Sequence, residues 1–223
     1  MSLEDLVAQL AREVQQHYYG KYRGVVVDNA DPERTGRLRL LVPSVLGATT
    51  TSWAPPVLPF GGTPDVGLFC VPEVDAAVWV EFEEGRLDHP LWTGAQWPAG
   101  QASGDQAVGD PAKRVLQSAS AHRLELDDTT GAEQVLLRHA GGARLAIDHQ
   151  GTVVVEDGAG GTLTMDAGAG KVLLEDANGN SIVLSSSGVL VEDANGNRIE
   201  LGASGLTLKG QMIAVQGQQV MLG

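Results

Sequence analysis

The second half of this 223-residue chain lacks proline and aromatic residues, and this absence constrains its fold more than any motif does. All ten aromatic residues lie at or before Trp97, and all ten prolines lie at or before Pro111. From His122 to Gly223 the chain instead carries 17 of its 29 glycines. Aromatic side chains dominate most protein cores, so this half must fold around small and aliphatic side chains alone.

One short pattern recurs through this half, in which two aliphatic residues flank a single residue. The pairs are Leu124/Leu126, Val135/Leu137, Leu145/Ile147, Val153/Val155, Leu163/Met165, Val172/Leu174, Ile182/Leu184, Val189/Val191, Ile199/Leu201, Leu206/Leu208, Ile213/Val215 and Val220/Leu222. Alternation with a period of two is typical of short strands with one buried face. Gly, Asn, Asp and Ser separate the pairs and favour turns.

The spacing of the pairs indicates a repeat. The segment Glu-Asp-Ala-Asn-Gly-Asn at residues 175–180 recurs at residues 192–197, which is a period of 17 residues. From Ile199 to Val220 the pairs follow one another every seven residues. A fixed short period of strand and turn predicts a β-solenoid or a β-prism.

A single chain of this kind offers only two apolar residues per strand. Burying an aliphatic side chain contributes about 1.5 to 3 kcal/mol, and that burial needs a partner surface. We therefore predict that three copies intertwine into a trimeric β-helix (β-prism) needle; a single-chain β-solenoid is the alternative. The predicted trimer core comprises Val172, Leu174, Ile182, Leu184, Val189, Val191, Ile199, Leu201, Leu206, Leu208, Ile213 and Val215.

Composition excludes several classes of protein. The net charge is −13, which argues against a nucleic-acid partner because Lys and Arg must neutralise phosphate. The single cysteine, Cys70, lies in an apolar run and is expected to be buried. The sequence shows no transmembrane run and no signal-peptide pattern, so we expect the chain to be made in the cytoplasm.

Residues 2–19 have the pattern of an amphipathic helix. Its apolar face comprises Leu3, Leu6, Val7, Leu10 and Val14. A lone helix of this length is marginal in water, so this face is expected to dock on another surface. That surface is either the next domain of the same chain or a neighbouring protein.

Residues 22–97 read as short strands punctuated by Pro and Gly. Predicted strands include residues 22–28, 37–42, 66–71, 76–83 and 91–95. Five or six strands in roughly 75 residues, with turns every 8 to 12 residues, fit a small closed β-barrel.

Several motifs in this segment carry a family resemblance. They are Arg-Gly-Val-Val-Val at 23–27, Asp-Pro-Glu-Arg-Thr-Gly-Arg at 31–37, Ser-Trp-Ala-Pro-Pro at 52–56, the run 72–82 and Asp-His-Pro-Leu-Trp-Thr-Gly at 88–94. Together they resemble the OB-fold domain of contractile-tail spike proteins: baseplate assembly protein V, the T4-type central spike and the VgrG proteins. By motif the resemblance covers about residues 20–98, and the order of barrel and needle covers nearly the whole chain.

The resemblance implies an all-β protein with an N-terminal helix, an OB barrel and a trimeric needle. The expected domains are a hub-docking segment (1–20), the barrel (21–98), a linker (99–120) and the needle (121–223). The linker is too short for the lysozyme domain of the T4-type spike. A separate baseplate hub is implied at the N-terminal end, and a PAAR-type tip protein on Val220, Met221, Leu222 and Gly223. Target-membrane contact would be transient, and effector cargo is left open.

No motif predicts catalysis, a cofactor or a metal. The Asp-rich turns at 176–180 and 193–197 lack the distant Glu and helix pair of an EF-hand, and Asn-Gly is a common turn dipeptide. No nucleophile elbow or phosphate-binding Gly loop is present. The resemblance, together with the absence of such motifs, implies a non-enzymatic central spike of a contractile injection particle. An OB-fold module that binds an oligosaccharide or nucleic acid is one alternative, and a cell-wall enzyme is another.

Overall fold

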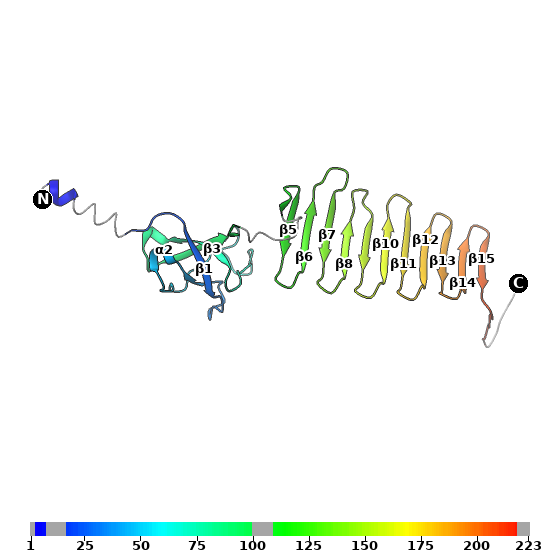
Figure 1. The fold of residues 1–223 in the computed structure, drawn as a ribbon. Coiled ribbons are helices and arrows are strands. Elements are labelled where there is room, and N and C mark those ends of the chain that lie inside the picture. The colour runs from blue at the N-terminus through cyan, green and yellow to red at the C-terminus, as the bar shows by residue number, and fades with distance from the viewer. Residues whose placement is uncertain (1–2, 8–16, 100–108, 218–223) are drawn as a thin grey trace. The chain divides into compact units, whose positions relative to one another are not determined.

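The structure, a computed structural model, describes residues 3–7, 17–99 and 109–217. Within these residues the chain is nearly all-β, and residues 3–7 form a short helix. The chain divides into two compact units, Met1–Ala102 and Ser103–Gly223 (Figure 1). The all-β prediction is confirmed.

The first unit contains a four-stranded antiparallel sheet with the order β2-β1-β3-β4. Its elements are β1 (Tyr22–Asp28), β2 (Arg39–Leu41), α2 (Pro43–Leu46), β3 (Ala77–Phe82), the 3-10 turn η1 (Glu83–Gly85) and β4 (Pro90–Ala95). In β3, Val78, Val80 and Phe82 are buried while the residues between them are half-buried. This alternation is the one that the period of two in the sequence predicts.

An irregular segment, residues 50–57, closes the sheet into a barrel. On one side Ala54 forms an antiparallel bridge with Leu38, which precedes β2. On the other side Pro56 forms a parallel bridge with Trp92 of β4. The two prolines at 55 and 56 explain why this segment makes bridges instead of a regular strand.

The barrel encloses a small apolar core. The buried residues are Val26, Leu38, Leu40, Val42, Ala54, Val78, Val80, Phe82 and Trp92. The buried Thr51 hydroxyl lies beside this core, and its Oγ1 accepts a hydrogen bond from the Leu40 backbone N–H at 3.0 Å. Because that hydroxyl is partnered, its burial carries little penalty.

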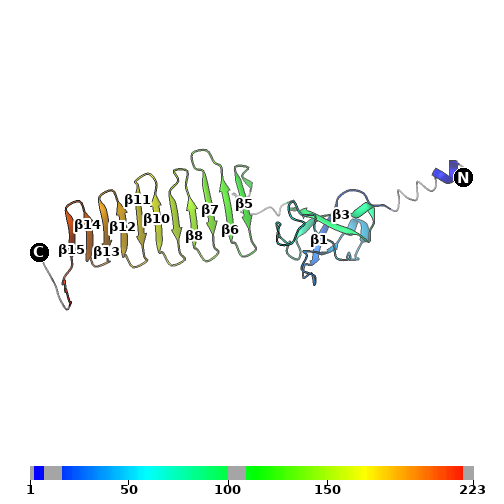
Figure 2. The same ribbon diagram turned by 180° about the vertical axis from the view of Figure 1, so that it is seen from behind.

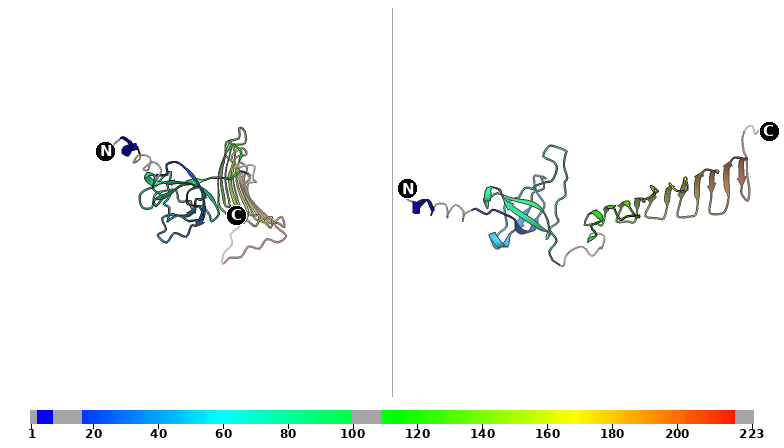
Figure 3. Two further views of the ribbon diagram at one scale, coloured as in Figure 1. Left: turned by 60° about the vertical axis from the view of Figure 1, so that its left-hand side comes forward. Right: turned by 90° about the horizontal axis from the view of Figure 1, so that it is seen from above.

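The strand predicted at residues 66–71 does not form. Residues 55–72 instead make a long loop, called the arm below, which projects from the barrel (Figure 3, right). A turn lies just before this segment, where the Val66 N–H donates to the Thr63 carbonyl oxygen at 3.3 Å and Asp65 adopts a positive φ of 61°. The expectation that Cys70 is buried is also wrong, because its side chain is exposed in the arm.

The second unit is one antiparallel sheet of eleven strands in sequence order, called the needle sheet below (Figures 1 and 2). Its strands are β5 (Lys113–Gln117), β6 (Arg123–Asp127), β7 (Gln134–Arg138), β8 (Arg144–Ile147), β9 (Val153–Glu156), β10 (Thr162–Asp166), β11 (Lys171–Glu175), β12 (Ser181–Ser185), β13 (Gly188–Glu192), β14 (Arg198–Gly202) and β15 (Gly205–Lys209). Viewed along the succession of strands, they superpose as one curved layer (Figure 3, left).

Every strand of the needle sheet pairs with its sequence neighbours in the same chain. The sequence pattern suggested strands wound among three chains, whereas the described strands form a single-chain meander. Tight turns of two to six residues make this local pairing the shortest connection. The strand predicted at Ile213 and Val215 is absent, and residues 212–217 have no regular structure.

Candidate trimer interface on the needle sheet

The strand register aligns the aliphatic pairs into two continuous rows on one face of the needle sheet, called the apolar face below. The first row is Leu116, Leu124, Leu137, Leu145, Val155, Leu163, Leu174, Ile182, Val191, Ile199 and Leu208. The second row is Leu126, Val135, Ile147, Val153, Met165, Val172, Leu184, Val189, Leu201 and Leu206. Residues directly opposite each other on neighbouring strands contact side by side, so the rows are continuous aliphatic ridges.

The apolar face is open in the isolated chain. None of its side chains is buried, and Leu174 and Leu184 are each 47% exposed. A hollow of about 950 Å³ follows the first row, and Met212 and Ile213 line its end. Soluble monomers rarely leave so many large aliphatic side chains uncovered in one contiguous patch. This face therefore has the character of an interface.

The opposite face of the sheet is polar at its margins and carries ion pairs. The Arg144 Nε lies 2.6 Å from the Glu156 Oε2, and the Lys113 Nζ lies 2.8 Å from the Asp127 Oδ2. The hydrogen bond from Lys113, with others from Thr129, lowers the pKa of Asp127 to about 2. Between these margins runs a central row, half-buried or buried within the single chain, which comprises Leu136, Ala146, Val154, Thr164, Leu173, Val183 and Leu190.

The repeated Asp-Ala-Asn-Gly-Asn segments form turns that their own side chains hold together. The Asp176 Oδ1 accepts hydrogen bonds from the backbone N–H groups of Asn178 and Asn180 at 2.9 and 2.8 Å. The Asn180 Nδ2 donates to the Asp176 Oδ2 at 2.6 Å. The Asn180 side chain is the main cause that holds the pKa of Asp176 well below its usual range. Gly179 supplies the positive φ of 88° that the turn requires.

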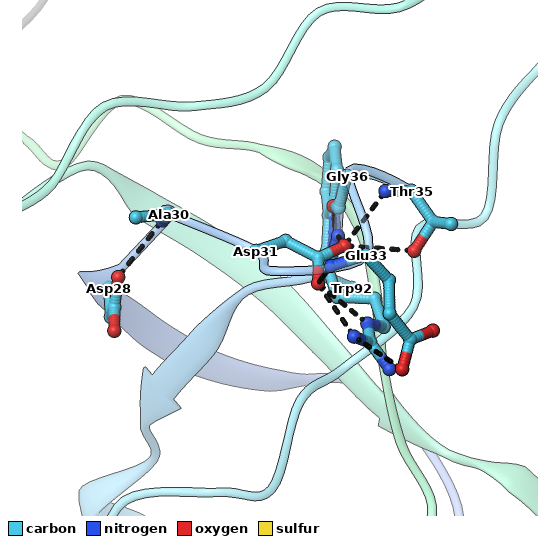
Figure 4. A network of polar contacts seen from close by, with 8 residues as sticks. Asp28, Ala30, Asp31, Glu33, Thr35, Gly36 and Trp92 are labelled. Atoms are coloured by element: carbon cyan, nitrogen blue, oxygen red, sulfur yellow. Dashed lines mark hydrogen bonds and ion pairs between the residues drawn. The ribbon is translucent and has the colours of Figure 1, made fainter.

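The barrel has its own buried carboxylate, in the turn that precedes β2 (Figure 4). The Asp31 side chain is 3% exposed and accepts a hydrogen bond from the Arg37 Nη2 at 2.7 Å. It also accepts from the backbone N–H groups of Glu33 and Thr35 at 3.1 and 2.8 Å. These donors, with Arg37 first, hold the pKa of Asp31 well below its usual range. The carboxylate is fully partnered, as a structural turn requires.

The same turn is tied to the core. The Trp92 Nε1 donates to the Gly36 carbonyl oxygen at 3.0 Å (Figure 4). The turn therefore links the start of β2 to β4 across the barrel. The motif Asp-Pro-Glu-Arg-Thr-Gly-Arg at 31–37 was noted for its family resemblance, but its role in linking β2 to β4 was not predicted. The spacing of Asp31 to Thr35 (i+4) and Arg37 (i+6) could have indicated that role.

The structure brings together ten of the twelve residues predicted for the trimer core. Val172, Leu174, Ile182, Leu184, Val189, Val191, Ile199, Leu201, Leu206 and Leu208 all lie on the apolar face. Ile213 and Val215 lie beyond the last strand. The pattern missed none of the strands between residues 123 and 209, but it did not anticipate β5, whose Leu116 extends the first row.

The predicted docking residues fall partly outside the described part of the chain. Leu3, Leu6 and Val7 are exposed on the short N-terminal helix. Leu10 and Val14, predicted to continue that face, lie outside the described residues. The predicted tip-binding residues Val220, Met221, Leu222 and Gly223 also lie outside them.

The described residues contain no group of three or more His, Cys, Asp or Glu side chains placed to hold a metal ion. His122 and His139 lie close, with ring centroids 4.6 Å apart. The Nδ1 atom of each accepts a hydrogen bond from a backbone N–H, of Ala140 and Gly141 respectively. These rings are therefore engaged in stabilising turns.

Among the described helices, none is long and apolar enough to cross a membrane.

Comparison with known families identifies both units. Residues 22–97 match the type VI secretion system/phage-baseplate injector OB domain. Residues 113–171 match the phage baseplate V C-terminal trimerisation domain. The matched segments together cover more than half of the chain, and no curated protein shows a significant match.

These matches agree with the geometry of each unit. The injector OB domain corresponds to the closed barrel, and the trimerisation domain covers the first six strands of the needle sheet, β5 to β10. A trimerisation domain supports a homotrimer and accounts for an apolar face that one chain leaves open. The predicted resemblance is thus confirmed: the chain belongs to the baseplate V family and is a structural spike of a phage-tail-like or type VI secretion-like injection system.

Proposed function

We propose that three copies of this chain bury their apolar faces against one another and form a stiff needle. The observation that carries this proposal is the pair of aliphatic rows, which run without a polar interruption from β6 to β15 on a face left open by one chain. The ten predicted core residues on that face would form the trimer core. Burial at about 25 cal/mol per Å² of apolar surface would drive the association.

Stiffness is the mechanical property that such a needle needs. Each described strand is hydrogen-bonded to its neighbours along the sheet, so an axial force would pass from strand to strand and be shared among the backbone hydrogen bonds of each ladder. The needle would transmit the thrust of sheath contraction and pierce the target envelope, with only transient membrane contact.

The remaining assignments follow from the family. Residues 1–20, with Leu3, Leu6, Val7, Leu10 and Val14, would dock on a baseplate hub together with the barrel of residues 21–98. The linker would be residues 99–120 and the needle residues 121–223. A PAAR-type tip protein would sit at residues 220–223. Both matched families are structural domains, which supports a role without catalysis. The chain would be made in the cytoplasm and then assembled into the particle.

Thiol labelling of the full chain tests the proposed core. In a Cys70→Ser background, one variant carries Ile182→Cys on the apolar face and its matched control carries Val183→Cys on the opposite face. Ile182 is 37% exposed in the single chain and Val183 is half-buried, so a lone chain would label as fast or faster at position 182. The trimer predicts the reverse, with strong protection at position 182 only. Equal or faster labelling at position 182 would contradict the proposal.

A further inference from the structure

The arm of the barrel carries an unusual concentration of exposed apolar side chains. The exposed large residues between positions 55 and 72 are Val57, Leu58, Phe60, Val66, Leu68 and Phe69. The two aromatic rings are 62% and 64% exposed. The barrel core contains only nine buried residues, and six large apolar side chains on the surface add nothing to its stability. The arm therefore has the character of an interface.

The arm has a defined shape despite its exposure. Its two limbs are joined by a hydrogen bond from the Leu68 backbone N–H to the Phe60 carbonyl oxygen at 3.2 Å. Glycines let the limbs approach closely, since a Cβ added at Gly61 would lie 3.3 Å from the Gly67 Cα. A pre-shaped apolar projection pays less entropy on binding than a flexible loop would.

A hollow lies at the base of the arm. Its volume is about 480 Å³, and its walls include Val57, Leu58, Leu68, Cys70, Trp92 and Ala95. Phe60 and Val66, nearer the tip, do not line it. Each barrel therefore presents an apolar projection and, beside it, an apolar recess.

The charge of the arm permits another copy of the barrel as the occupant. Residues 22–97 contain ten acidic and five basic residues, so two barrels repel unless their contact is uncharged. The arm meets this requirement, because Asp65 is the only charged residue between positions 55 and 72.

The tether to the trimerisation domain also favours a second copy. Fifteen residues separate the two matched segments, and a chain of that length spans at most about 50 Å even when fully extended. Three barrels tethered to one trimer would therefore meet at millimolar effective concentration, at which even a modest apolar contact forms.

We infer that in the homotrimer the arm of each barrel packs into the hollow of the next. The tip of the arm, with Phe60 and Val66, is a different surface from the hollow, so the contact is heterologous and closes into a ring with threefold symmetry. The inference rests on the homotrimer and adds a second interface, between barrels, to the one along the needle.

The single cysteine provides a direct readout, because Cys70 lines the hollow. The full chain would be labelled with a maleimide while native mass spectrometry records its oligomeric state. The test variant combines Phe60→Ser and Val66→Ser, which alter the projecting part of the arm without touching the hollow. We expect this variant to remain trimeric and its Cys70 to react about tenfold faster than in the unaltered chain.

Val27→Ser is the matched control, because Val27 is an exposed apolar residue of β1 outside the arm. This control is expected to label at the unaltered rate. Equal Cys70 rates in the unaltered trimer and the arm variant would overturn the inference while leaving the needle proposal intact. A chain that is monomeric under all conditions would overturn both.

Discussion

Asn180 and Ala194 belong to successive turns on the same edge of the needle sheet, and the Asn180 Oδ1 accepts a hydrogen bond from the Ala194 backbone N–H at 3.2 Å. The Asn197 Oδ1 makes the equivalent contact with the Gln211 N–H at 3.3 Å. On the opposite edge the Thr152 Oγ1 accepts from the Ala167 N–H at 3.3 Å. The side chain that ends a turn thus links that turn to the next one along the edge.

Replacing this linking side chain should weaken the sheet. Asn180→Ala removes the contact with Ala194 and the hydrogen bond to Asp176, and we expect a loss of about 1 to 2 kcal/mol in the free energy of unfolding. Chemical denaturation followed by circular dichroism would measure it. Asn178→Ala is the control, because that side chain contacts only Asp176 of its own turn. An equal loss in both variants would contradict the linking role.

In a single chain, polar substitutions on the more exposed face of β12 would cost less stability than one on the other face. In the trimer we expect the reverse order. Ile182→Thr with Leu184→Thr replaces two exposed aliphatic side chains, whereas Val183→Thr replaces a half-buried one. If the apolar face is the trimer core, the double variant loses about 3 kcal/mol or more per chain and lowers the dissociation midpoint. The single variant should lose clearly less stability than the double variant, because position 183 lies on the opposite face and outside the proposed core. Denaturation monitored by oligomeric mass distinguishes them.

Gly188 should not tolerate a side chain. Its φ is 132°, and a Cβ there would lie 1.8 Å from the Leu201 carbonyl oxygen on the neighbouring strand. Gly188→Ala must therefore separate β13 from β14. Gly205→Ala, at a φ of 121° with open space around the Cβ, should cost only the strain of about 1 to 3 kcal/mol. Thermal unfolding should show a clearly larger loss for Gly188→Ala; similar losses would refute the steric account.

The Asp31 turn should make the barrel sensitive to acid. Because the native pKa of Asp31 lies below its ordinary value of 3.8, the native state binds fewer protons than the unfolded state. The stabilisation is fully present above about pH 4 and is lost as the pH falls toward the native pKa. Asp31→Asn should lower barrel stability at neutral pH and flatten its dependence on pH below 4.

Urea denaturation of the full chain between pH 2.5 and 7 would test this, with barrel unfolding followed by tryptophan fluorescence, because all four tryptophans lie between residues 53 and 97. Asp28→Asn is the control, because that carboxylate accepts a hydrogen bond from the Ala30 N–H at an exposed site. A pH profile of Asp31→Asn as steep as that of the unaltered chain would contradict the assignment.

The needle sheet was largely predictable because its pattern is local. Pairs such as Ile182/Leu184 have a period of two, and Asn178-Gly179 marks the turn before them, so strand and turn both follow from short-range chemistry. The same logic gave the alternation of Val78, Val80 and Phe82 in the barrel.

Features that depend on contacts between distant parts of the chain were harder to predict from the sequence. Residues 66–71 have the composition of a strand, yet no neighbouring strand is available to pair with them, and Cys70 is consequently exposed. The period of the apolar residues does not tell whether adjacent strands of the needle sheet come from one chain or from three. The donors that surround Asp31 come from residues whose convergence depends on the fold of the turn.

The mass of the purified full chain in solution tests the central claim most directly. If the apolar faces associate as proposed, native mass spectrometry and light scattering will give three times the chain mass of 23.3 kDa. That mass should persist on dilution, because an interface of two aliphatic rows per chain dissociates slowly. A folded, soluble species at 23.3 kDa would contradict the account.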